Sequence, residues 1–215
     1  AQTEIGGRAT AKLDLSVNQA DQQANVKLNG ENLLYKSVTL RSFSASALFE
    51  NIKNKWPRQF DLKLSGGKLS EDITVKNLSA SLQEAGADLY LLKLDGLVNT
   101  RQDISILGKA ELSGLRASQP AAHDIDLKIG SKSSTVNLKG EVGLEKIDMQ
   151  ISTSGFNLVN IPVALPEAVQ SSNLKGDVKV TGALNNPAIQ ANILTSLSYP
   201  GKSAGDLAIS LRSNY

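Results

Sequence analysis

Val26-Lys27-Leu28-Asn29-Gly30 is the stretch that decides the fold of this chain, because its order of apolar, polar, apolar, polar and glycine residues returns four times. Alternation with a period of two is typical of a β-strand with one buried face, and the glycine gives the backbone freedom for a turn or a bulge. The pattern therefore predicts one kind of β-unit laid down several times. The other copies are Leu62–Gly66, Leu92–Gly96, Val136–Gly140 and Val178–Gly182.

The same two-residue rhythm continues between these copies. Turn signals such as Gly66-Gly67, Asp95-Gly96 and Pro200-Gly201 separate the alternating runs. The chain is therefore expected to be all-β, with about fourteen to sixteen short antiparallel strands joined mostly by short turns. Further runs of this kind contain Leu13 and Leu15, Val38 and Leu40, Ile73 and Val75, Ile104 and Ile106, Ile125 and Leu127, Ile147 and Met149, Ile189 and Ala191, and Leu207 and Ile209.

Two segments depart from the alternation. Apolar residues from Ala45 to Trp56 fall at helical spacing, and Pro57 would end such a helix. The repeat favours a strand instead, because residues 44–48 resemble residues 79–82 of the next unit. Both alternatives are open for this segment. Residues 165–170, with Pro166 at a first-turn position, could form a second short helix.

Composition narrows the classes of function. The 215 residues are 40% hydrophobic and 4% aromatic, and 23 basic residues face 21 acidic ones, a net charge of +2. The lysines alternate with apolar residues and do not cluster, so the chain lacks the concentrated basic face of a nucleic-acid-binding protein. With no cysteine, it has no disulfide, thiolate nucleophile or sulfur-ligated metal.

The ends of the sequence suggest part of a larger protein. No segment approaches the roughly 18 apolar residues of a membrane-spanning helix, and the first residues do not resemble a signal peptide. The chain does not begin with methionine. We therefore expect residues 1–215 to form a single repetitive domain cut from a longer chain.

Residues that could carry catalysis are nearly absent. His123 is the only histidine, which rules out a metal site of several histidines, and it is expected to be a surface loop residue. Residues 65–68 match the Ser-x-x-Lys spacing of some acyl enzymes, but a Gly-Gly turn explains them better. Acidic residues between apolar neighbours are what an amphipathic sheet requires. The sequence thus predicts no enzyme, no cofactor and no metal.

A long one-sided sheet can bury its apolar face in two ways. Two sheets can pack face to face as a β-sandwich filled by their own side chains. Alternatively, one sheet can curl into an open trough with an apolar lining that accepts a guest. Periodicity alone favours the sandwich, since most amphipathic sheets pack against another layer.

A resemblance favours the trough. Residues 157–166 are an apolar run with two prolines, and residues 174–193 combine a glycine-containing strand, a second glycine six residues later and Asn186-Pro187 at the start of the next strand. This stretch resembles the C-terminal region of the TamB family of the AsmA-like superfamily. The resemblance implies a periplasmic, U-shaped (taco-like) β-groove in a protein anchored to the bacterial inner membrane.

The resemblance also implies a function, namely a segment of a periplasm-spanning bridge that carries phospholipid between the inner and outer membranes. The alternative is a scaffold for outer-membrane protein assembly that works with a TamA-like barrel protein and accepts client strands by β-augmentation. For the first function, phospholipid acyl chains would lie on one apolar lining. The residues expected there are Leu28, Leu64, Leu94, Ile106, Leu127, Leu138, Met149, Val180 and Ile193.

Overall fold

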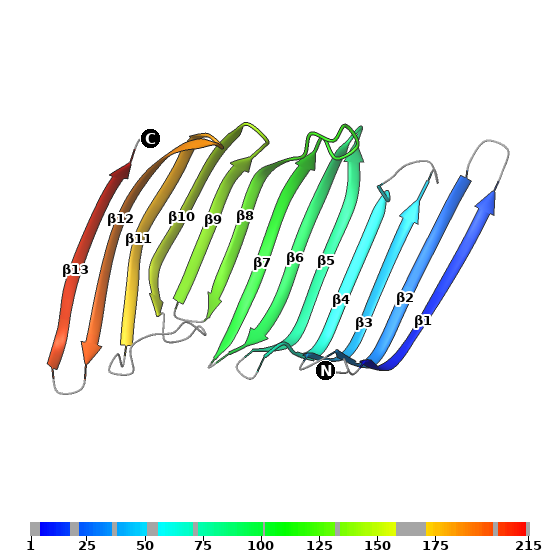
Figure 1. Ribbon diagram of the computed structural model, residues 1–215, viewed down its shortest axis with the longest axis horizontal. Helices are drawn as coiled ribbons and strands as arrows, with labels where there is room; N and C mark the ends of the chain where they lie inside the picture. The colour runs from blue at the N-terminus through cyan, green and yellow to red at the C-terminus, as the bar shows by residue number, and fades with distance from the viewer. Residues whose placement is uncertain are drawn as a thin grey trace.

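The computed structural model describes residues 5–17, 22–35, 38–50, 56–70, 73–100, 102–131, 134–157, 171–199 and 202–213. They form one antiparallel sheet of thirteen strands, each paired with its neighbours in sequence (Figure 1). A single sheet means that the alternative of a β-sandwich is wrong. The strands are β1 (Ile5–Val17), β2 (Gln22–Tyr35), β3 (Val38–Phe49), β4 (Gln59–Lys68), β5 (Thr74–Gly86), β6 (Leu89–Asn99), β7 (Asp103–Ser113), β8 (Ala121–Ser131), β9 (Ser134–Val142), β10 (Lys146–Asn157), β11 (Ser171–Ala183), β12 (Asn186–Tyr199) and β13 (Lys202–Ser213).

The strands are longer than the sequence suggested, and the described part of the chain has fewer of them. They contain 9 to 14 residues each, because the alternation runs through several glycines that were expected to end strands. Strand β3 takes up residues 45–49, so the strand alternative holds there and the helical one is wrong. The short helix expected over 165–170 lies outside the described residues.

The glycines of the repeated pattern lie within strands β2, β4, β6, β9 and β11. Residues 65–68 are the end of β4, so the Gly-Gly turn expected there is wrong, although Gly66 does adopt a positive φ of 62°. Gly140 adopts a φ of 137°, where a side chain would be strained, and the carbonyl group of Asp148 in the neighbouring strand approaches it closely. Gly140 therefore lets a neighbouring backbone approach closely inside the sheet, whereas the nearest atoms at Gly30, Gly66 and Gly96 belong to side chains.

The register gives the sheet two chemically different faces. Directly paired residues point to the same side of a sheet, and residues one position along point to the other. One set of paired residues, the central apolar row, crosses all thirteen strands without a charge. It consists of Ala11, Leu28, Ala45, Leu62, Ala80, Leu94, Gly108, Leu127, Leu138, Ile151, Val178, Ala191 and Leu211.

The adjacent set of paired residues, the central polar row, lies on the opposite face. Its basic residues outnumber its acidic ones, and two directly opposed pairs carry like charges, Lys12 with Lys27 and Lys93 with Lys109. The row consists of Lys12, Lys27, Ser46, Asp61, Ser81, Lys93, Lys109, Asp126, Lys139, Gln150, Lys179, Gln190 and Arg212.

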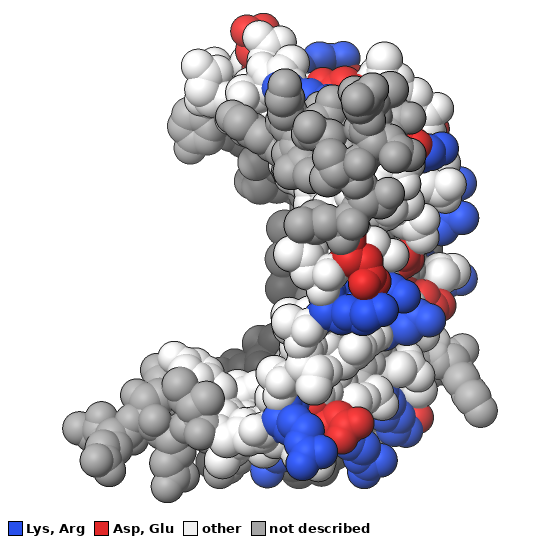
Figure 2. All heavy atoms as spheres, turned by 90° about the vertical axis from the view of Figure 1, so that its right-hand side faces the viewer, with Lys and Arg blue, Asp and Glu red and all other residues white. Residues whose placement is uncertain are grey.

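The sheet is bent but neither closed nor strongly curled. Its pairing is interrupted at several points, for example between Thr153 and Phe156 in β10 and between Ala122 and Ile125 in β8. Such bulges bend a strand and increase its local twist. Figure 2 shows one hollowed side, with most of the visible Lys, Arg, Asp and Glu residues on the bulging side. None of the described residues belongs to a helix that could cross a membrane.

Candidate apolar binding surface

The nine residues expected to line a groove all lie on one face of the sheet. Leu28, Leu94, Leu127 and Leu138 belong to the central apolar row. The others fall into two rows that flank it. Leu64, Ile106 and Ile193 stand two residues away from the central row in strands β4, β7 and β12. Met149 and Val180 form a directly opposed pair on the other side of that row.

This apolar face is only partly buried. Leu28 is 38% exposed, and the other eight residues expected to line a groove are half-buried. Within one sheet, the partial burial comes from neighbouring side chains, and no second layer of described residues covers the face. Monomeric proteins rarely expose so large an apolar surface without a use for it.

The face is long as well as apolar. Adjacent strands lie about 4.8 Å apart, so thirteen strands give a row roughly 60 Å long. Its side chains are aliphatic, with few rings and no charge in the central row. Such a lining has few polar atoms that would hold one particular ligand in one place.

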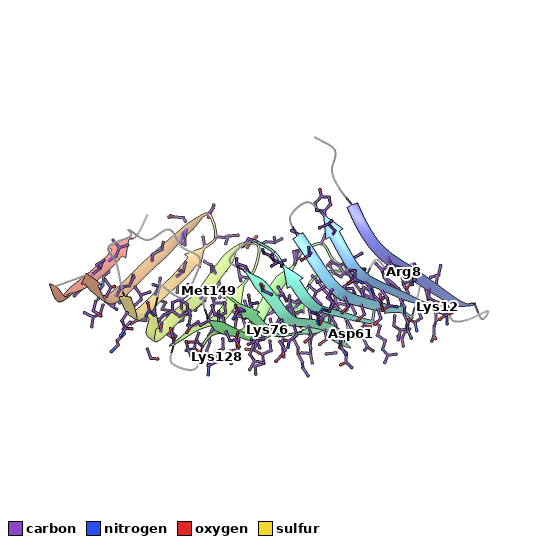
Figure 3. All side chains as sticks on the ribbon, turned by 90° about the horizontal axis from the view of Figure 1, so that it is seen from below. Arg8, Lys12, Asp61, Lys76, Lys128 and Met149 are labelled. Atoms are coloured by element: carbon purple, nitrogen blue, oxygen red, sulfur yellow. The ribbon has the colours of Figure 1, made fainter. Side chains whose placement is uncertain are left out.

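The opposite face is charged and open to water. Figure 3 labels Met149 and Lys128 on opposite sides of the ribbon, as the register requires. Two open hollows of about 760 and 630 Å³ lie over this charged face, and residues such as Lys93, Lys109 and Asp126 line both. The charged residues that line these open hollows are of both signs and mostly exposed. They do not form a defined site for an anion or a cation. Among the described residues, no group of three His, Asp or Glu side chains is placed to hold a metal ion.

Charged side chains stand at one edge of the apolar face in a group that we call the rim cluster. It consists of Glu84, Asp88, Tyr90 and Arg116. Tyr90 is fully buried and shares its face with Leu92 and Leu94, and Glu84 pairs directly with it. The guanidinium of Arg116 lies 5.6 Å from the Tyr90 ring centre and 2.7 Å from Glu84 Oε1. Burial raises the pKa of Tyr90 above its usual value, and the positive charge of Arg116 opposes this shift.

Loop 114–120, between β7 and β8, carries Arg116 to this position. The backbone N–H of Arg116 donates to Asp88 Oδ1 at 2.8 Å. The indole N–H of Trp56, just before β4, donates to the carbonyl oxygen of Leu115 at 3.1 Å. The loop is thus held at both the β5–β6 turn and the segment before β4. Sequence reasoning missed this cluster, since its members are not marked by any motif.

His123 lies within strand β8, so its expected position in a loop is wrong. Its Nε2 is 3.0 Å from Ser113 Oγ, and its Nδ1 is 3.6 Å from Glu141 Oε2. The second distance is too long for a hydrogen bond, and both side chains of that pair are more than 40% exposed. The pKa of Glu141 is lowered below its usual value. Lys146 makes the largest contribution to this shift, and His123 the next largest. The sequence alone could not reveal this grouping, because it depends on the register of β7, β8 and β9.

The chain was also compared with known proteins. No protein-family model, curated protein or solved structure matches it. The resemblance of residues 157–193 to the AsmA-like superfamily therefore stands as a proposal, and the function must be argued from the sheet itself.

Proposed function

We propose that the apolar face binds phospholipid acyl chains and lets them move from strand to strand along the length of the sheet. In this proposal the chain is a segment of a periplasm-spanning bridge between the inner and outer membranes of a bacterium, within a longer protein anchored to the inner membrane. The observation that carries the proposal is the central apolar row, which crosses all thirteen strands without a charged residue.

The chemistry of this face suits acyl chains better than a ligand of fixed shape. Each CH₂ group that leaves water contributes about 0.8 kcal/mol, whichever aliphatic side chain it contacts. An acyl chain that slides along the sheet leaves the side chains of one strand and contacts those of the next. It exchanges one apolar contact for an equivalent one. Movement along the row then needs no catalytic residue, and a headgroup can stay in water at the open side.

The bend of the sheet supports a finer proposal about shape. In Figure 2 the hollow side is opposite the side that carries most of the visible charges. If the strand ends draw closer around a bound lipid, the sheet becomes the U-shaped groove that the family resemblance implies. The same resemblance suggests the periplasm as the compartment, and the absence of cysteine is compatible with it.

Photo-crosslinking tests this proposal on matched positions. A crosslinking residue at Leu94 or Leu138, both in the central apolar row, should capture phospholipid. The same residue at Lys93 or Lys139, one position away on the charged face, should not. Native mass spectrometry of the purified chain should also detect retained lipid. Equal capture on the two faces, or no lipid at any position, would contradict the proposal.

A second candidate function rests on the edge strands. Among the described residues, β1 and β13 each pair with a neighbour on one side only. Leu13 is 59% exposed and Ile209 is 45% exposed, so both strands combine free backbone groups with apolar side chains. Such an edge can accept a strand of a client protein. Crosslinkers at Leu13 and Ile209 would then capture an outer-membrane protein, and capture of lipid alone would contradict this candidate.

A further inference from the structure

The ion pair of the rim cluster, between Arg116 and Glu84, is more buried than the other ion pairs of the described residues. The side chains of Arg116 and Glu84 are 32% and 19% exposed, whereas the other ion pairs have side chains at least 41% exposed. Exposed pairs contribute little to stability, but a partly buried pair keeps its charges fixed at one place. The fixed charges of the rim cluster stand beside an apolar surface.

The charges of the rim cluster also have a defined arrangement. Arg116 contacts two carboxylates: its guanidinium pairs with Glu84, and its backbone N–H donates to Asp88. A purely anionic group would meet more negative than positive charge here. A group that carries both a phosphate and an ammonium would find a partner for each of its charges.

A further observation points to a missing partner at the same place. The hydroxyl of Tyr90 is buried and has no acceptor for its own proton among the described residues, because the Arg116 guanidinium beside it can only donate. A buried hydroxyl that cannot donate its proton is costly, so native structures rarely contain one without an explanation. A ligand oxygen held by Arg116, which lies over the Tyr90 ring, would give this hydroxyl an acceptor.

We propose that the rim cluster binds the headgroup of a zwitterionic phospholipid whose acyl chains lie on the adjoining apolar face. This inference rests on the proposed function, because the acyl chains occupy the face around Leu92 and Leu94. Arg116 donates hydrogen bonds to the phosphate, and the carboxylates of Glu84 and Asp88 accept hydrogen bonds from the ammonium. The cluster then selects lipids by headgroup at one point of an otherwise unselective surface.

Competition between two lipids tests the inference. The purified chain is mixed with vesicles of equal parts phosphatidylethanolamine and phosphatidylglycerol, and native mass spectrometry measures the ratio of the two lipids retained. The unsubstituted chain should retain more phosphatidylethanolamine. Glu84→Gln should lower that ratio at least threefold, because the ammonium loses a carboxylate. Asp126→Asn makes the same chemical change on the charged face and should leave the ratio unchanged.

The outcomes separate the two proposals. If the unsubstituted chain retains no lipid, the proposed function fails and the headgroup site fails with it. If it retains lipid but the ratio is even, or Glu84→Gln leaves the ratio unchanged, only the headgroup site fails. Should Glu84→Gln prevent folding, Asp88→Asn removes the other carboxylate and must lower the ratio in the same direction. A structural role alone would alter the amount of lipid but not the preference between headgroups.

Discussion

Replacing Gly140 with alanine tests how far the glycines of the repeated pattern shape the sheet. Gly140 pairs directly with Met149, and its φ of 137° is one that residues with a side chain rarely adopt. An added Cβ would overlap the backbone carbonyl of Asp148 and would lie 2.9 Å from the Met149 Cα. Both groups belong to the backbone of β10, so neither can turn aside as a side chain would.

The expected loss of stability follows from these two effects. A strained backbone conformation costs about 1–3 kcal/mol, and forcing extra volume into a packed site costs a further 1–3 kcal/mol or so. Gly140→Ala should therefore lower the free energy of unfolding by about 2–6 kcal/mol. That is a large part of the roughly 5–15 kcal/mol that stabilises a typical domain.

Urea unfolding followed by circular dichroism measures this loss, with Gly86→Ala as the matched control. A Cβ at Gly86 would meet only the Leu89 Cβ at 3.9 Å, an ordinary contact. The control should therefore change the free energy of unfolding by less than about 0.5 kcal/mol. If Gly140→Ala costs no more than Gly86→Ala, the close approach of β10 to Gly140 does not constrain the fold and the reasoning is wrong.

Three other predictions concern side chains. Lys146→Gln should raise the pKa of Glu141 toward its usual value, since Lys146 is the main cause of its lowering; carbon-13 NMR titration of the carboxyl measures this. Because that pKa is lowered in the folded chain, its stabilising effect is present above the usual carboxyl pKa and is lost as the pH falls through the lowered value. Lys93→Glu should stabilise the sheet by a few tenths of a kcal/mol, because it replaces the directly opposed like charges of Lys93 and Lys109 with a Glu–Lys pair. An unchanged midpoint of urea unfolding would contradict this. Leu82→Ala should cost about 2–4 kcal/mol, because Leu82 is 7% exposed, and a cost under about 1 kcal/mol would show that its site is not packed.

Much of the fold could be predicted from local pattern. Alternation of apolar and polar residues can be recognised from adjacent positions in the sequence. The all-β class and the shared face of Leu94 and Leu138 were therefore predictable. The placement of strand ends was not. Gly66 was expected in a turn and Gly140 in a turn or a bulge, yet both strands continue, because pairing with neighbouring strands offsets the low intrinsic preference of glycine for sheet.

The candidate sites divide along the same line. The apolar face could be predicted, because the position of each residue in the alternating pattern gives the side of the sheet on which it lies. The rim cluster could not, because Glu84, Tyr90 and Arg116 come together through a hairpin and a loop whose course no local pattern describes. The contact between Ser113 and His123 likewise depends on which residues of β7 and β8 lie opposite each other.

By itself, the sequence determined that the chain forms strands and which side chains share a face, since alternation with a period of two is a local property of an extended backbone. Only the tertiary structure decided between one sheet and two packed sheets, because both satisfy the same alternation. It also decided the register, which joins thirteen separate alternations into one uncharged row. Register depends on contacts between residues far apart in the chain, so no single stretch of sequence contains it.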